Sequence, residues 1–98
     1  MEDVVVEVEY CNKCGYLLKF EELKKHVADH HSIVTVVGRE GRRGSFEVKI
    51  NESLVHSKLQ TLAYPDYNDL GNLIEDAKNG KSVNRQCKQQ PITSCAIS

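Results

Sequence analysis

Cys11 and Cys14 are the residues of this 98-residue chain whose type and spacing most directly indicate covalent chemistry. They form a Cys-x-x-Cys motif between a valine-rich segment, which predicts a strand, and a helix-forming segment. A helix N-terminus carries partial positive charge and unpaired N–H groups, and both favour a thiolate over a thiol. The thiolate is the nucleophile in thiol–disulfide exchange, and a second thiol nearby can displace the bound partner. The motif therefore predicts a catalytic redox pair that closes a Cys11–Cys14 disulfide.

The position of each cysteine suggests its role. Cys11 is expected at the end of the strand, where it would be the more exposed of the two thiols. This reasoning assigns the attack to Cys11 and the resolving step to Cys14. Lys13 and the helix N-terminus would each lower the pKa of a neighbouring thiol.

A zinc site is the competing interpretation of the same cysteines. Cys11, Cys14, His26 and His30 follow a zinc-finger order, one residue short of the usual spacing. A helix that starts near Cys14, however, carries the histidines roughly 18–24 Å along its axis, so the two interpretations exclude each other. The chain also continues with elements that a zinc finger does not need. We therefore predict no metal, and keep the zinc-binding module as an alternative.

The elements that must position the pair begin with a strand over Val4–Tyr10, whose valines on both faces suit a buried central strand. A helix is expected over Lys13–His30, because apolar residues recur on one face at helical spacing. A second strand is expected over Ile33–Val37. A strand–helix–strand unit of this length predicts two parallel strands.

The rest of the body predicts a hairpin and a second helix. The glycine-rich segment Gly38–Gly44 is expected to be an exposed loop. Strands are expected over Phe46–Ile50 and Leu54–Leu59, followed by a helix that Asp66 caps and that ends before Gly80. The resulting order, β-α-β-β-α, is that of a small thioredoxin-like fold of the α/β class.

The composition changes after Gly80. Residues 81–94 are polar and lack periodicity, so we predict a single domain over residues 1–80 and a disordered tail over residues 81–98. Residues 78–98 hold four Lys or Arg and no acid, whereas the rest of the chain holds nine against fourteen Asp or Glu. The body lacks a basic stripe, which argues against nucleic-acid binding. Because the sequence starts with acidic residues, we expect no secretory leader. Because it lacks a long apolar run, we expect no membrane-spanning helix.

The last four residues, Cys95-Ala96-Ile97-Ser98, form a prenylation box, and the terminal serine favours a farnesyl group on Cys95. One isoprenoid binds a membrane only marginally, so a second signal is expected. The basic tail could meet an anionic membrane surface, and Cys87 is a second candidate, for palmitoylation. The sequence thus predicts that a prenyltransferase is a partner of this chain. It also predicts that the protein is cytoplasmic and is held at the cytosolic face of membranes. Its tether would reach about 20 Å from Gly80.

Three separated segments, Tyr10–Tyr16, Gly44–Asn51 and Leu54–Lys58, resemble the selenoprotein W-like (Rdx) family, and the likeness covers about residues 4–80. The resemblance implies a thioredoxin-like fold and thiol redox activity, with glutathione or protein thiols as partners. In selenium-containing members the selenium occupies the position of Cys14, which implies that Cys14 attacks. A prenylated branch of the family also ends in a lipidation box. The cis-proline of thioredoxins has no counterpart in Gly44-Ser45-Phe46.

Other polar residues have simpler expected roles. Arg42 or Arg43 would attract a glutathione carboxylate if the glycine loop lies beside the cysteines. His26, His30 and His31 are expected to be solvated at the end of the first helix, and His56 to face solvent from its strand. The alternative function is a non-enzymatic, membrane-tethered signalling adaptor in which the cysteine pair is a sensor or has lost its role.

Overall fold

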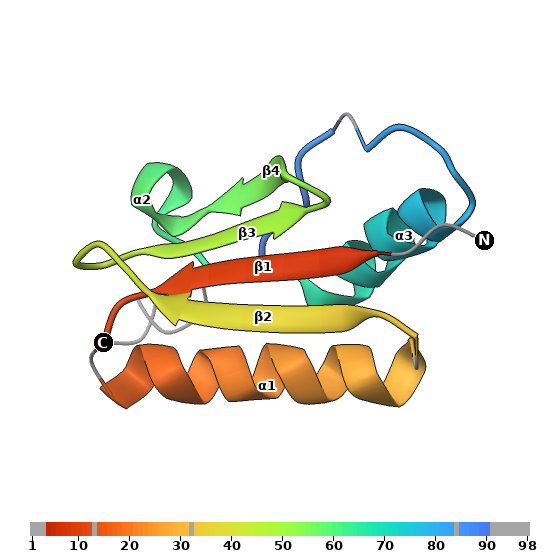
Figure 1. Ribbon diagram of the computed structural model, residues 1–98. Helices are drawn as coiled ribbons and strands as arrows, with labels where there is room; N and C mark the ends of the chain where they lie inside the picture. Colours follow the sequence, from red (N-terminus) through yellow and green to blue (C-terminus); the bar gives the residue numbers. More distant parts are fainter. Residues whose placement is uncertain (1–3, 13, 32, 84, 91–98) are drawn as a thin grey trace.

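The computed structural model describes residues 4–12, 14–31, 33–83 and 85–90. Within them, four strands form one sheet in the order β2-β1-β3-β4, in which β1 pairs parallel with β2 and antiparallel with β3 (Figure 1). The strands are β1 (Val5–Tyr10), β2 (Thr35–Glu40), β3 (Phe46–Ile50) and β4 (Ser53–Ser57), and the helices are α1 (Cys14–His30), α2 (Lys58–Thr61) and α3 (Tyr67–Lys78). The predicted parallel unit and the predicted hairpin are both confirmed, as is the β-α-β-β-α order, to which the structure adds the short helix α2.

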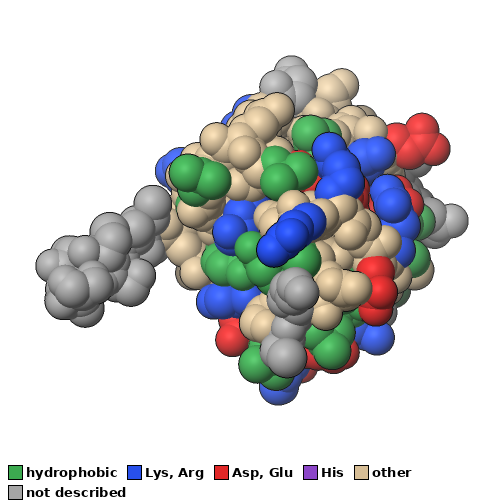
Figure 2. Space-filling model, turned by 90° about the vertical axis from the view of Figure 1, so that its left-hand side faces the viewer, with side chains coloured by type: hydrophobic (Ala, Val, Ile, Leu, Met, Phe, Trp, Pro, Cys, Tyr) green, Lys and Arg blue, Asp and Glu red, His purple; other side chains and the backbone are tan. Residues whose placement is uncertain are grey.

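β1 and β2 end, and α1 begins, at the same end of the molecule, where α2 also lies (Figure 1). Figure 2 views the molecule from this end, which we call the site end because the cysteine motif connects β1 to α1 here. None of the helices in the described part of the chain combines the length and the apolar character that crossing a bilayer requires.

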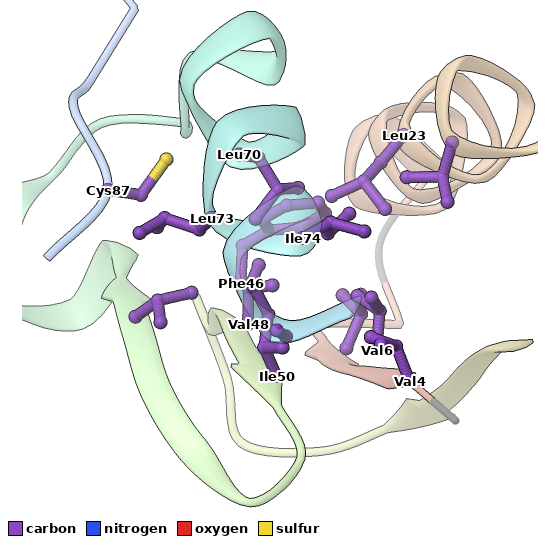
Figure 3. Packing of buried hydrophobic residues seen from close by; sticks show 14 of the residues in the cluster. Val4, Val6, Leu23, Phe46, Val48, Ile50, Leu70, Leu73, Ile74 and Cys87 are labelled. Carbon is purple, nitrogen blue, oxygen red and sulfur yellow. The ribbon is translucent and has the colours of Figure 1, made fainter. Parts of the chain in front are cut away.

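The hydrophobic core lies between one face of the sheet and the helices α1 and α3 (Figure 3). Val6 and Val8 of β1 are fully buried on this face. Glu7 and Glu9 alternate with them and so lie on the opposite, open face, as the two-residue period of a strand requires. Val5, on that open face, is 40% exposed, so β1 is central in the sheet but buried on one face only, contrary to the prediction.

Several element boundaries differ from the sequence-based expectation, and two of them have a clear physical reason. Gly38, predicted to be in a loop, belongs to β2 and pairs with Val8. A Cβ atom on Gly38 would lie 2.3 Å from the ring of Phe20, so the missing side chain is what lets α1 pack onto β2. The predicted strand Leu54–Leu59 stops at Ser57, whose side chain accepts a hydrogen bond from Gln60 N at 3.2 Å and so caps α2.

Residues 85–90, which we call the strap, differ most from the prediction of a disordered tail. Hydrogen bonds join Cys87 N to Val55 O at 2.8 Å, Asp66 N to Lys88 O at 2.8 Å, and Gln90 N to Tyr64 O at 2.9 Å. The strap therefore pairs with the segment before α3 and covers part of the outer edge of β4. Residues 91–98 lie outside the described residues.

A buried carboxylate explains why this polar segment is ordered. Asp69, on α3, is 5% exposed and binds the guanidinium of Arg85 through two hydrogen bonds of 2.8 and 2.9 Å. It also accepts a hydrogen bond from Lys88 N at 2.8 Å. These donors hold the pKa of Asp69 well below its usual range, with Arg85 as the largest cause. A polar composition alone does not reveal such a partner.

Candidate functional site

Cys11 directly follows β1, and Cys14 is the first residue of α1, so the structure places the motif at the predicted strand–helix junction. Cys11 N donates a hydrogen bond to Ser45 O at 3.0 Å. The turn between β2 and β3 therefore lies against the cysteine motif, as the glutathione hypothesis required. Cys11 itself is only 2% exposed, which contradicts the expectation of a solvent-exposed thiol at the strand end.

Two tyrosines and two lysines gather beside the motif. Lys58 Nζ lies 3.3 Å from the hydroxyl of Tyr16 and 5.4 Å from the ring centre of Tyr64. Lys19 Nζ lies 4.9 Å from the same ring centre. Burial raises the pKa of Tyr64, and the neighbouring Tyr16 and Cys11 add to the effect, so Cys11 is within electrostatic reach of this phenol. The candidate site thus has cationic groups on α1 and α2, held against the two tyrosine rings beside the motif.

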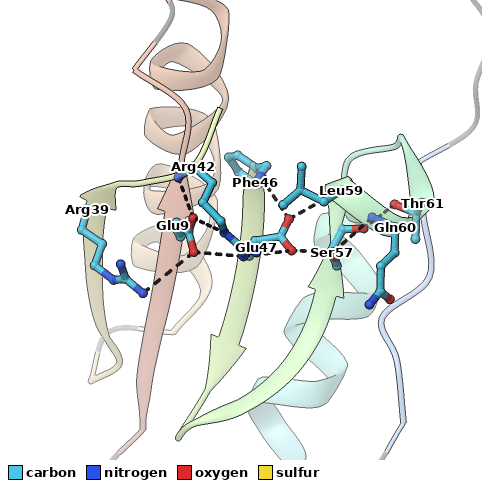
Figure 4. Close-up of polar contacts among 9 residues, drawn as sticks. All are labelled: Glu9, Arg39, Arg42, Phe46, Glu47, Ser57, Leu59, Gln60 and Thr61. Carbon is cyan, nitrogen blue, oxygen red and sulfur yellow. Dashed lines mark hydrogen bonds and ion pairs between the residues drawn. The ribbon is translucent and has the colours of Figure 1, made fainter. Parts of the chain in front are cut away.

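Arg42 occupies the turn beside the motif, but its charge is already paired. Its side chain lies 3.0 Å from a carboxylate oxygen of Glu9, and its backbone N–H donates to the same oxygen at 2.7 Å (Figure 4). These bonds lower the pKa of Glu9 to about 2. The expectation that Arg42 or Arg43 attracts a glutathione carboxylate stays a prediction; Arg42 is paired with Glu9, whereas Arg43 is exposed.

Glu47 positions the start of α2. It lies on β3, is 6% exposed, and accepts hydrogen bonds from the hydroxyl of Ser57, from Leu59 N at 3.3 Å and from Phe46 N at 3.2 Å (Figure 4). A buried carboxylate with several donors holds them in one geometry. Through Ser57 and Leu59, Glu47 fixes the helix that carries Lys58.

His56 and His31 are buried rather than solvated as we expected, whereas His30 is exposed, in agreement with the expectation. His56 is 1% exposed, and its Nε2 donates to Ala63 O at 2.7 Å, which ties β4 to the segment after α2; burial lowers its pKa. His31 is 7% exposed and lies 3.2 Å from Glu75 of α3. His26 stacks on His30, with ring centres 4.3 Å apart.

The zinc interpretation fails on the geometry of α1. The helix is continuous from Cys14 to His30, so His26 lies about 18 Å from Cys14 along the axis. The described residues also contain no group of three or more His, Cys, Asp or Glu side chains that could hold a metal ion.

Cys87, the predicted candidate for palmitoylation, lies inside the core. It is 5% exposed, its Sγ lies 3.5 Å from Asp66 O, and burial raises its pKa to about 12. A buried and protonated thiol is a poor nucleophile, which contradicts this assignment while the strap is docked. Cys95, the candidate for prenylation, lies outside the described residues.

Sequence reasoning missed the lysine–tyrosine cluster and the Asp69–Arg85 pair. Lys19 belongs to α1, Lys58 to α2 and Tyr64 to the segment before α3, and no local spacing connects them. Ser57 carried a usable signal, since a serine before a short polar segment is a common helix cap.

The chain matches the model of the Rdx family over residues 5–76. It is 35% identical to migration and invasion enhancer 1 of Mus musculus over 88 residues, which are 90% of this chain and 76% of the relative. The Bos taurus protein of the same name is 34% identical over the same shares.

Solved structures agree on the fold. A selenoprotein W-related protein from Vibrio cholerae superposes with a TM-score of 0.67 at 20% identity, over 78% of this chain and 98% of that one. A protein from Bordetella parapertussis superposes with a TM-score of 0.67 at 17% identity, over 78% of this chain and 99% of that one. The small thioredoxin-like α/β fold is thereby confirmed, and by its sequence the chain belongs to the Rdx family.

Proposed function

We propose that this protein is a thiol–disulfide redox protein that uses Cys11 and Cys14 as its dithiol pair. The observation that carries the proposal is that the motif bridges the end of β1 and the first residue of α1. There the helix N-terminus favours a thiolate, and Lys58 and Lys19 bring positive charge to the neighbouring Tyr16 and Tyr64 rings. Membership of the Rdx family is consistent with this redox chemistry.

The burial of Cys11 supports the assignment that the family resemblance implies, in which Cys14 attacks. Because Cys11 is 2% exposed, Cys14 at the helix N-terminus is the better attacking thiol and Cys11 the resolving one. The Cys14 thiolate attacks a disulfide, forms a mixed disulfide and releases one partner as a thiolate. Cys11 then loses its proton and attacks the Cys14 sulfur, which closes the Cys11–Cys14 disulfide and releases the second partner.

Glutathione or protein thiols are the proposed redox partners. Two glutathione molecules would reduce the Cys11–Cys14 disulfide and leave as oxidised glutathione. Lys58 and Lys19, rather than Arg42, would attract the glutathione carboxylates, because Arg42 is paired with Glu9.

Single cysteine variants test this assignment. Cys11→Ser removes the resolving thiol, so after incubation with oxidised glutathione it should accumulate a mixed disulfide at position 14, detected by mass spectrometry of peptides. Cys14→Ser is the matched control and should acquire little glutathione at position 11, because that position is buried. Glutathione bound equally to the two variants would refute the assignment, and its absence from both would refute the redox proposal.

A second candidate function is a non-enzymatic signalling adaptor, which the burial of Cys11 also favours. The double variant Cys11→Ser/Cys14→Ser separates the two functions. If the protein acts through redox chemistry, the double variant would lose the effect that the protein has in cells. If the protein is an adaptor, the double variant would keep that effect.

We further propose that farnesylation of Cys95 tethers the protein to the cytosolic face of membranes. The support is the box Cys95-Ala96-Ile97-Ser98 together with the basic residues that precede it. Replacing Cys95 with Ser should move the protein from the membrane fraction of a cell lysate to the soluble fraction. An unchanged distribution would contradict the tether.

A further inference from the structure

We propose that the site end is the surface that faces the membrane, so that the cysteine motif operates at the surface of an anionic bilayer. This inference rests on the proposed lipidation of Cys95 and adds an orientation to it. The contact residues are Leu17, Leu18, Leu59 and Leu62, with Lys19 and Lys58.

The strap sets where the tether leaves the body. Gly80 lies with Asn51 and Ser53 beside the turn between β3 and β4, at the end of the molecule opposite to the motif. The strap carries the chain back from there to Gln90, whose N–H bonds Tyr64 O at 2.9 Å. The Tyr64 ring lies 6.3 Å from the ring of Tyr16 in the first turn of α1. The tether therefore starts beside the site end.

The remaining tether is short. Cys95 follows Gln90 by five residues, which span about 17 Å even when fully extended. A lipid at Cys95 would thus hold the bilayer close to Tyr64, and the opposite end of the molecule would point away from it. A flexible tether starting at Gly80, as the sequence suggested, would have imposed no such orientation.

The site end carries the apolar side chains that a bilayer contact needs. Leu18 is 66% exposed and Leu17 44% in the first turns of α1, while Leu59 is 40% and Leu62 76% exposed in and after α2. Figure 2 shows hydrophobic and basic side chains interspersed over this end. One isoprenoid binds membranes only marginally, so an apolar and basic surface supplies the second signal.

Leu62 is the most informative of these residues. It closes α2 in the left-handed conformation, with φ of 60°, where glycine is the usual residue. A leucine here is both strained and exposed to water, two costs that glycine would not have. Insertion of this side chain into the interface of a bilayer would account for its presence.

Lys19 and Lys58 supply the complementary charge for an anionic surface. Both ammonium groups lie over the Tyr64 ring, within 4.9 and 5.4 Å of its centre, so they are held at the site end beside the leucines. Each basic residue near an anionic leaflet adds to binding, and the effect falls off within a Debye length.

Tryptophan fluorescence tests the orientation directly, because the chain contains no tryptophan. Farnesylated full-length Leu62→Trp is mixed with vesicles of phosphatidylcholine and phosphatidylserine, and Ile33→Trp is the matched control. Ile33 is 57% exposed and lies beyond the last residue of α1, at the opposite end. We expect a blue shift and quenching by brominated lipids for the Leu62→Trp variant alone.

Every other outcome contradicts part of the proposal. If the farnesylated protein sediments with vesicles but the fluorescence of the Leu62→Trp variant does not shift, the orientation is wrong and the tether stands. If the farnesylated protein fails to sediment with vesicles, both the tether and the orientation fall. A shift for Ile33→Trp instead would mean that the opposite end faces the bilayer.

Leu62→Gly separates binding from folding. Because glycine suits a φ of 60°, this variant should be at least as stable as the parent, while its vesicle affinity falls by about 5-fold. The control Ile33→Ser should bind vesicles with unchanged affinity. Unchanged binding by Leu62→Gly would overturn the proposal and leave this surface to a protein partner.

Discussion

At the scale of single residues, largely buried carboxylates rather than the cysteines organise the site end. Glu9 and Glu47 both point to the open face of the sheet, and each collects donors from a different loop or helix (Figure 4). Glu9 holds the turn that bonds Cys11, and Glu47 holds α2. Each of these carboxylates therefore positions part of the surroundings of the cysteine motif.

The Glu9–Arg42 pair predicts a specific pH dependence. The pKa of Glu9 is lowered from 4.5 to about 2, so its carboxylate stabilises the fold above pH 4.5 and the stabilisation is lost as the pH falls toward 2. Arg42→Met should destabilise the protein only modestly at pH 7, because the Arg42 side chain is 66% exposed. Urea denaturation of both proteins at several pH values should show this difference closing between pH 4.5 and 2. A difference independent of pH would contradict the assignment.

At the scale of elements, the absence of a side chain at Gly38 allows α1 to pack closely on the sheet. Gly38→Ala would place a methyl group against Phe20, so it should destabilise the protein by about 1–3 kcal/mol. Gly15→Ala is the matched control, because a Cβ atom at Gly15 in α1 meets nothing within 4 Å. This second variant should stabilise by about 0.5–1 kcal/mol through helix propensity. Thermal denaturation measures both, and equal effects would refute the packing argument.

We predict that docking of the strap controls the reactivity of the Cys87 thiol. Asp69→Asn weakens the bonds to Arg85 and to Lys88 N, and should cost about 1–3 kcal/mol of strap docking. Cys87 should then react with iodoacetamide much faster than in the parent, where burial raises its pKa to about 12. Peptide mass spectrometry locates the adduct. The control Asp29→Asn alters an exposed pair with Lys25 and should leave Cys87 protected.

At the scale of the whole molecule, the strap makes residues 85–90 part of the folded body. A chain ending at Gly80 would lose the Asp69–Arg85 pair, the backbone hydrogen bonds of the strap and the burial of Cys87. We expect this truncation to cost about 2–4 kcal/mol in the free energy of unfolding and to uncover the edge of β4. A chain ending at Gln90 should unfold like the parent in urea. Equal stability of the two truncated chains would show that the domain stops at Gly80.

The sequence by itself determined the elements and the chemical character of the motif. Alternating and helical periodicities in short segments encode β1, α1, the hairpin and α3, because each pattern depends only on near neighbours along the chain. The redox chemistry of the Cys-x-x-Cys pair could be predicted from its place between a strand and a helix alone.

Only the tertiary structure decided what surrounds the pair. The burial of Cys11, the meeting of Lys19 and Lys58 over Tyr64, and the Asp69–Arg85 pair all join residues from separate elements. Such contacts depend on how the sheet and helices pack, and local patterns do not carry that information. For the same reason a polar segment that looked disordered became the strap once a buried carboxylate on α3 could bind it.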